Sequence, residues 1–400
     1  MKTLFFAWRY LWSRPLGAAL NLLLLSLGLA SMTFLLLVGT QLSKAFDRDL
    51  AGIDLVVGAK GSPMQLILSG VLHIDVPPGN VPLKAVQELA RHPLVAQVIP
   101  ISLGDNLAGY RIVGTTTAYP AHYGAQLAQG ALWTQPMQAV LGAAVAKSLG
   151  LQVGQTFIGS HGLGGGGHAH GDNAYTVVGI LAPGGSVLDR LILTDTASVW
   201  KVHEDATALD DDDRQVMEEE REVTMALVLY KTPMAAVSLP RYVNTSTEMQ
   251  AAAPALEISR LLSMLGLGTD VLRAFAAVLL LTAGLSVFIA LWSAVRERRS
   301  DLALLRMLGA SPAKVATLLL SEALWLGLLA SVLGVALGQG FAAALARFLS
   351  LDHSLLLGGM VWPAALWGVP ALALVVSLAS AVLPTVAAYR VSVLRLLQSR

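Results

Sequence analysis

The sequence predicts an α-helical membrane protein with four transmembrane helices and a large α+β extracytoplasmic domain inserted between helices 1 and 2. Composition is the first reason. The 400 residues are 55% hydrophobic and 13% charged, and the mean hydropathy of +0.63 exceeds what soluble globular chains carry. The second reason is that four long apolar runs each exceed the ~20 residues needed to cross a ~30 Å hydrocarbon core. One long excursion, residues 41–268, separates the first run from the other three.

The first apolar run, residues 16–40, is predicted as transmembrane helix 1. It follows a short N-terminal segment, residues 1–15, which contains Lys2, Arg9 and Arg14. A signal peptide also starts with basic residues, but its apolar region usually has only ~7–15 residues. We therefore interpret this run as a retained anchor.

The other three spans are predicted at residues 269–295, 313–348 and 361–388. Basic residues gather in segments 1–15, 296–312 and 389–400. The positive-inside rule places these segments, with both termini, in the cytoplasm, so the excursion and the loop 349–360 face outward. The protein is thus expected to cross a membrane four times, in contact with lipid. The net charge of +1 gives no reason to expect nucleic acid.

The excursion alternates strand-like and helix-like stretches, which predicts an α+β domain with its own core. Strand-like stretches are AQVIPI, TFIGS, YTVVGIL, LILTD and MALVLY, and helix-like stretches are PLKAVQELARH and AAVAKSLG, the latter ended by Gly150. Residues 242–268 read as a helical stalk leading into transmembrane helix 2. We expect the apolar run Met64 to Leu72 to pack on the outer leaflet or on a partner protomer. The alternative is that the glycines of this stretch, Lys60 and His73 line a substrate route at the membrane surface.

The stretch RERRSDLALLRMLGASPAKV, residues 296–315, places five basic residues between two apolar runs. As a helix it is amphipathic, with arginines on one face and leucines on another. Gly309 can end this helix, and Ser311 followed by Pro312 is typical of the start of the next. Charge alone would also suit an orientation signal or a lipid contact.

This stretch resembles the signature of the FtsX-like permease family, the MacB- and LolCE-type permeases of ABC transporters. VLGAAVAKSLGLQVGQTF, YTVVGILAPGG and the C-terminal PTVAAYRVSVLRLL are also similar to the family, although Ala387, Ser392 and Val393 depart from its usual tail. The resemblance implies that the stretch couples the permease to an ATP-binding subunit. It also implies a location in the bacterial inner membrane. The implied coupling residues are Arg296, Glu297, Arg299, Leu304, Leu305, Arg306, Leu308 and Gly309.

The energy source is expected on another subunit. The sequence has no G-x-x-x-x-G-K-[ST] loop to hold nucleotide phosphates, and no catalytic triad or paired carboxylates are visible. We therefore expect no enzyme activity and no cofactor on this chain, with ATP and Mg²⁺ on the partner. The resemblance implies a dimer with a second permease protomer, identical or different.

Two features of the spans carry further hypotheses. Glu322 is an acid within transmembrane helix 3, which is a functional hypothesis by default, although pairing with an arginine for structure is the simpler interpretation. Gly334 and Gly338 form a G-x-x-x-G pattern that permits close helix packing and would suit a dimer interface.

A glycine-rich loop contains His161, His168, His170 and Asp172, which could bind zinc. Such a loop is also typical of a mobile insertion. We interpret the chain as an ABC permease subunit that transports or extracts an envelope substrate, with a link to zinc homeostasis and with a periplasmic adaptor or substrate-binding protein as a further partner. The alternatives are an FtsX-like regulator of an envelope enzyme and a metal-sensing membrane protein.

Overall fold

The computed structural model describes residues 2–13, 15–161, 169–207, 217–218, 220–297, 311–351 and 362–389. The chain forms two compact units. The helical unit comprises Met1–Leu42, Leu265–Arg347 and Gly358–Arg400, and the inserted unit comprises Ser43–Met264 and Phe348–Leu357.

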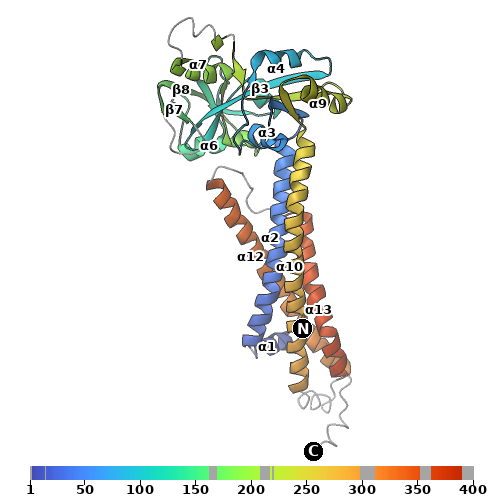
Figure 1. Ribbon diagram of the computed structural model, residues 1–400. Helices are drawn as coiled ribbons and strands as arrows, with labels where there is room; N and C mark the ends of the chain where they lie inside the picture. Colours follow the sequence, from blue (N-terminus) through green and yellow to red (C-terminus); the bar gives the residue numbers. More distant parts are fainter. Residues whose placement is uncertain are drawn as a thin grey trace, which may run out of the picture. The chain divides into compact units, whose positions relative to one another are not determined.

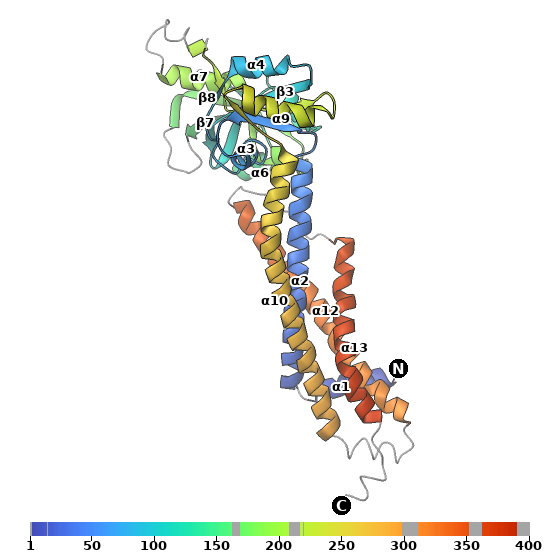
Figure 2. The ribbon, with the colours of Figure 1, turned by 45° about the vertical axis from the view of Figure 1, so that its right-hand side comes forward.

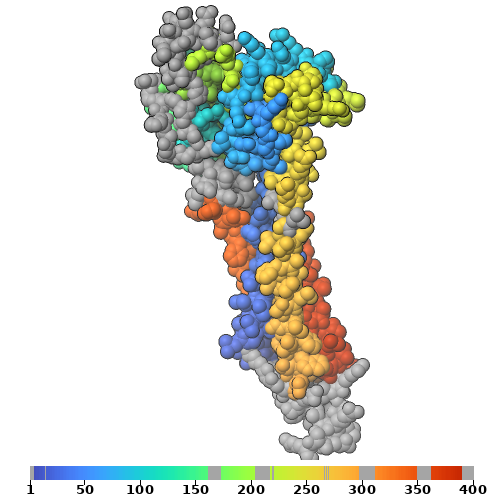
Figure 3. All heavy atoms as spheres, in the orientation of Figure 1, coloured from blue at the N-terminus to red at the C-terminus, as the bar shows by residue number. Residues whose placement is uncertain are grey.

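Four long apolar helices dominate the helical unit and confirm the predicted spans. They are α2 (Pro15–Asp49), α10 (Pro254–Glu297), α12 (Pro312–Leu351) and α13 (Gly368–Tyr389), which follows the short η2 (Ala364–Trp367). In the described part of the chain these four are long and apolar enough to cross a membrane. Helices α2 and α10 lie side by side (Figures 1 and 2), and Figure 3 shows α10 flanked by α2 and α13.

Small residues let these helices approach closely. A methyl group at Gly28 of α2 would lie 3.0 Å from Leu280 Cδ2 of α10, and one at Gly284 of α10 would lie 3.2 Å from Ser380 Oγ of α13. A methyl group at Gly327 of α12 would lie 2.3 Å from Ser377 Oγ of α13. Because lipid tails are as apolar as the side chains, such close packing is what holds membrane helices together.

The G-x-x-x-G pattern of α12 packs against α2 of the same chain. A methyl group at Gly334 would lie 2.6 Å from Leu29 Cβ, and one at Gly338 would lie 2.5 Å from Thr33 Cβ. The pattern therefore closes the circle of contacts among the four helices, and its predicted use in a dimer interface stays a prediction.

A short helix, α1 (Lys2–Leu11), precedes the first span and is fixed to α12. The Trp325 indole nitrogen donates a hydrogen bond to the Leu4 carbonyl oxygen at 3.1 Å, and the Trp8 and Trp325 rings meet edge to face with centroids 5.1 Å apart. Phe5 and Phe6 are exposed on this helix. The N-terminal segment is thus part of the folded unit.

The inserted unit is built on a ten-stranded mixed sheet in the described residues. The strand order is β12-β1-β11-β3-β4-β9-β6-β8-β5, and β7 pairs with β3 and β8. The strands are β1 (Leu55–Ala59), β3 (Val95–Leu107), β4 (Tyr110–Thr115), β5 (Leu127–Gly130), β6 (Gln138–Leu141), β7 (Thr156–His161), β8 (Ala169–Leu181), β9 (Ile192–Asp195), β11 (Met225–Tyr230) and β12 (Met249–Ala252), and a separate pair joins β2 (Val81–Pro82) to β10 (Glu222–Val223).

Helices cover this sheet and complete two hydrophobic cores. One core joins β1, β11 and β12 to flanking helices, and the other gathers around β4, β6, β8 and β9. The helices are α3 (Pro63–Gly70), α4 (Leu83–Ala90), α5 (Ala118–His122), α6 (Ala143–Leu149), η1 (Val187–Arg190), α7 (Thr196–Thr207) and α9 (Ala235–Ser246). Gly150 ends α6 with a positive φ of 67°, as predicted.

Two sequence predictions in this unit were wrong. The apolar run Met64 to Leu72 forms α3, whose Leu66 and Ile67 are fully buried inside the unit, so it does not cover an outer leaflet or a partner. The predicted helix over residues 242–268 is interrupted by β12, because the Met249–Ala252 backbone pairs with β1. Local helical periodicity was overridden there by sheet pairing.

Replacing Gly338 by alanine is expected to destabilise the helical unit by about 1–3 kcal/mol, because the added methyl has no room beside Thr33. Gly340→Ala is the matched control, since a methyl there meets nothing within 4 Å. Thermal unfolding of both variants in detergent measures the effect. Equal melting temperatures would contradict the packing described here.

Candidate functional site

The predicted coupling segment lies largely outside the described residues. Helix α10 ends at Glu297 after an exposed Arg296, and the chain is described again from Ser311. The predicted start of the next helix is confirmed, because the Lys314 backbone N–H donates to Ser311 Oγ at 3.4 Å ahead of α12. The remaining coupling residues, Arg299, Leu304, Leu305, Arg306, Leu308 and Gly309, stay predictions.

The other predicted site residues are placed only in part. Glu322 lies on the fourth turn of α12 and is 8% exposed, so its acid group is packed inside the helical unit. The backbone of His161 ends β7, and His170 and Asp172 belong to β8, whereas His168 lies outside the described residues. Among the described residues there is no group of three acids or histidines suited to a metal, and zinc binding by this loop stays a prediction.

The clearest built site in the inserted unit is the end of α2. Asp49, the last residue of this helix, is 3% exposed, and its Oδ1 accepts a hydrogen bond from the Val187 backbone N–H at 2.9 Å. The Asp49 carbonyl accepts from Tyr123 Oη at 2.8 Å, and the Ala51 carbonyl accepts from His122 Nε2 at 2.8 Å. These bonds satisfy backbone groups that a helix end leaves open, and they fix the helix to the unit.

Arg190 supplies the positive charge near this carboxylate. It is 6% exposed, and its Nη2 donates to the Leu72 carbonyl at 2.5 Å. Burial lowers the pKa of Arg190, and the nearby charge of Asp49 opposes that shift. Burying an acid and a base together costs free energy because both lose their hydration, but their directed contacts fix the orientation of the helix end.

A neutral histidine lies beside this pair. His73 is 6% exposed, has a φ of 53°, and forms a hydrogen bond between its Nε2 and Tyr119 Oη at 3.0 Å. Burial lowers its pKa well below the usual range, and the positive charges of Arg111 and Arg190 lower it further. The same burial raises the pKa of Tyr119 and of Tyr123. His73 is therefore uncharged at neutral pH.

The two long helices α2 and α10 are connected to strands that pair with each other, β1 and β12. Strand β12 ends at Ala252 and α10 begins at Pro254, while β1 follows α2 after a short turn. The two strands pair antiparallel, with Val56 opposite Ala252. Both long helices thus attach to neighbouring strands of one sheet.

Comparison with known families identifies this arrangement. Residues 18–253 match the model of the MacB-like periplasmic core domain, and residues 273–393 match that of the FtsX-like permease C-terminal domain. The chain belongs to the FtsX-like and MacB-like permease family. The predicted resemblance is confirmed. The permease is a multi-pass inner-membrane protein, and its inserted unit is the periplasmic core domain.

A curated relative is also similar. The pyoverdine export ATP-binding/permease protein PvdT of Pseudomonas putida is 25% identical over 370 residues, which cover 86% of this chain and 52% of that protein. The chain thus spans about half the length of this relative.

Two solved structures are similar to about half of this chain. The periplasmic region of MacB from Actinobacillus actinomycetemcomitans is 13% identical with a TM-score of 0.35, over 54% of this chain and 95% of that one. The extracellular domain of the noncanonic ABC-type transporter YknZ from Gram-positive bacteria is 13% identical with a TM-score of 0.30, over 50% of this chain and 98% of that one.

Sequence reasoning missed the anchor at Asp49. Asp49 and Arg190 are far apart along the chain, and neither belongs to a motif with fixed spacing. The available signal was that no glycine or proline lies between the apolar run, residues 16–40, and Asp49, so the helix could continue beyond the membrane.

Asp49→Ala is expected to destabilise the periplasmic domain of the permease by about 3 kcal/mol, because it leaves Arg190 and the Val187 N–H without this carboxylate. Asp47→Ala, at an exposed position of the same helix, is the control. Hydrogen exchange of the segment around Val187 should accelerate only in the first variant. Unchanged protection in Asp49→Ala would refute the anchor.

His73 makes stability depend on pH. Its folded pKa is depressed, whereas the unfolded chain has a value near 6.5, so the unfolded state binds more protons below about pH 6.5. The free energy of unfolding should therefore fall with decreasing pH in that range, by up to ~1.4 kcal/mol per pH unit from this group.

His73→Asn tests this dependence, because asparagine tolerates a positive φ and does not titrate. Melting temperatures of the permease at pH 7.5 and 5.5 should differ less in this variant than in the natural protein. The same difference in both proteins would show that His73 is not the titrating group.

Proposed function

We propose that this permease couples ATP hydrolysis on a separate ATP-binding subunit to movement of its periplasmic domain, and thereby transports or extracts an envelope substrate. One observation carries the proposal: two long helices join neighbouring paired strands, α2 through a short turn before β1 and α10 one residue after β12. At 1.5 Å per residue their 35 and 44 residues extend over ~52 Å and ~66 Å. Both exceed a ~30 Å hydrocarbon core.

Stiff helices suit this task because an α-helix resists compression and bending more than a loop does. A displacement at the end of α10 near Arg296 would be carried along the helix to β12. The attachment of α2 at Asp49 and of α10 at β12 gives the sheet two points at which it can be moved. A loop at either position would absorb the displacement.

The ATP-binding partner is supported by the family and by the sequence. The name of the relative PvdT combines ATP binding with a permease, and this chain spans about half of that protein. The 400 residues contain no phosphate-binding loop of the Walker type. We therefore propose that the nucleotide is held by a partner that docks on the leucines of segment 296–312, in a complex that contains two permease protomers.

The docking proposal is tested with Leu305→Asp and Leu308→Asp, made separately. Each places a charge in a predicted apolar contact, and each should abolish copurification with the ATP-binding subunit and its stimulated ATPase activity. Lys314→Asp is the control, because Lys314 is exposed at the start of α12 and lies outside the leucine face. Normal coupled ATPase activity in both leucine variants would refute the assigned docking surface.

A further inference from the structure

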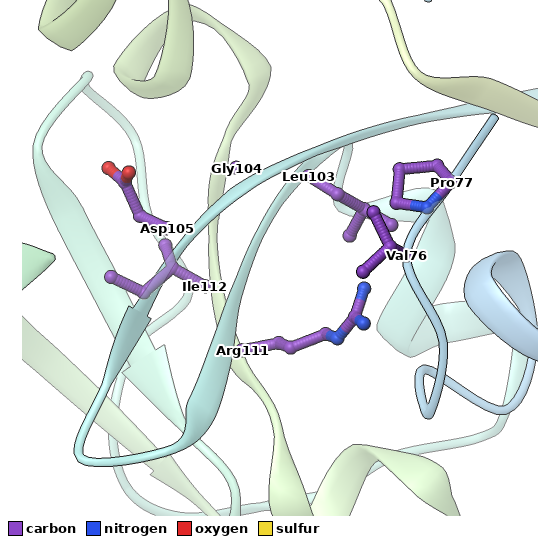
Figure 4. A pocket seen from close by; sticks show the side chains of 7 residues that line it. All are labelled: Val76, Pro77, Leu103, Gly104, Asp105, Arg111 and Ile112. Atoms are coloured by element: carbon purple, nitrogen blue, oxygen red, sulfur yellow. The ribbon is translucent and has the colours of Figure 1, made fainter. Parts of the chain in front are cut away.

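A small cavity lies inside the periplasmic domain beside β3 and β4 (Figure 4). Its volume is about 190 Å³, and it is lined by Val76, Pro77, Leu103, Gly104, Asp105, Arg111 and Ile112. A single water needs only ~15 Å³, whereas pockets for drug-sized ligands start at ~300 Å³. The cavity therefore suits a compact molecule of a few non-hydrogen atoms.

One guanidinium dominates the polar lining. Arg111 is 6% exposed and points across the cavity toward Val76 (Figure 4). Its Nη2 donates to the carbonyl oxygen of Asp75, and its Nε has no hydrogen-bond partner within the described part of the chain. A buried charged donor without an acceptor is costly, and such groups in proteins are normally satisfied.

The protein neutralises this charge only in part. The Asp75 carboxylate accepts a hydrogen bond from the Val76 backbone N–H at 2.7 Å, and Arg111 contacts the Asp75 carbonyl instead. Burial lowers the pKa of Arg111 to about 10, which the charge of Asp75 opposes, and Arg111 stays protonated at neutral pH. A positive group thus faces a cavity with mostly apolar walls.

The acid on the cavity lining does not fill this role. The Asp105 carboxylate points away from the Arg111 guanidinium (Figure 4). Its negative charge instead affects Tyr175: burial raises the pKa of Tyr175, and the charge of Asp105 raises it further. The space next to the guanidinium is therefore bounded by Val76 and Leu103 (Figure 4).

We propose that this cavity binds a small carboxylate, with the carboxylate on Arg111 and a short aliphatic group against Val76 and Leu103. A guanidinium presents paired N–H donors that match the two oxygens of a carboxylate. A single cation in an apolar cavity does not match phosphate, which carries more charge and more acceptors. The site goes beyond the proposed coupling function and does not depend on it.

Ligand-observed NMR on the full-length permease in detergent tests the site with three probes. The probes are 2-methylpropanoate, its neutral amide 2-methylpropanamide, and inorganic phosphate. We expect saturation transfer to the methyl protons of 2-methylpropanoate and none to those of the amide. Added phosphate should leave the 2-methylpropanoate signal unchanged. Equal transfer to the amide would overturn the role of charge, and phosphate competing with 2-methylpropanoate would overturn the assignment to carboxylates.

Variants locate the binding. Arg111→Gln should weaken binding of 2-methylpropanoate about tenfold or more, because a charged donor is lost, whereas Arg91→Gln at an exposed position should not. Val76→Phe keeps the charge but fills the cavity mouth, where Val76 is 55% exposed, and should also weaken binding. This second variant decides the matter if Arg111→Gln fails to fold. Undiminished binding in Val76→Phe would overturn the site.

Discussion

The pairing of β1 with β12 is the constraint on which the architecture depends. Val56 and Val57 of β1 lie opposite Ala252 and Ala251, and this ladder sets the positions from which both long helices leave the sheet. The strands are also buried: Leu55 and Val57 share a core with Met249 and Ala251. A single residue separates the end of β12 at Ala252 from the start of α10 at Pro254, so little chain lies between them to absorb a displacement. In the proposed coupling, movement of α10 would therefore move the sheet or break its hydrogen bonds.

The two units of the chain are stabilised by different interactions. In the helical unit, glycines at helix crossings have no side chain and so let the helices pack closely. This close packing stabilises the unit because burying apolar side chains gains nothing when the surrounding lipid is equally apolar. In the periplasmic domain, apolar burial is supplemented by buried charges at Asp49 and Arg190. Such groups contribute less to the net free energy of folding than apolar packing, but their hydrogen bonds fix direction. The proposed transmission of movement requires that directional restraint.

Much of the fold could be predicted because its signals are local. Four runs of apolar residues identify the spans, and alternating patterns such as MALVLY and YTVVGIL identify β11 and β8. The helix over residues 143–149 and its glycine end follow from the same kind of local pattern. The family signature adds the coupling segment, whose residues Leu305 and Leu308 stay predictions.

The rest depends on contacts between distant parts of the chain. Helix α3 was expected on a membrane or a partner because its apolar face has no local explanation, and only the fold shows that Leu66 packs beside Gly58 of β1. Residues 249–252 were expected in a helix, and pairing with β1 decides otherwise. Asp49, His73, Arg111 and Arg190 acquire their roles only when β4 and η1 are placed beside the end of α2, a juxtaposition that no sequence spacing reveals.

The central claim is that nucleotide on the partner moves the periplasmic domain. The chain has no cysteine, so Val237→Cys, at a position 77% exposed, offers a single site for a spin label. Electron paramagnetic resonance can then measure the distance between the labels of two protomers in the complex with the ATP-binding subunit. The account predicts different distance distributions in the nucleotide-free and ATP-bound complexes. Identical distributions in both states would contradict it.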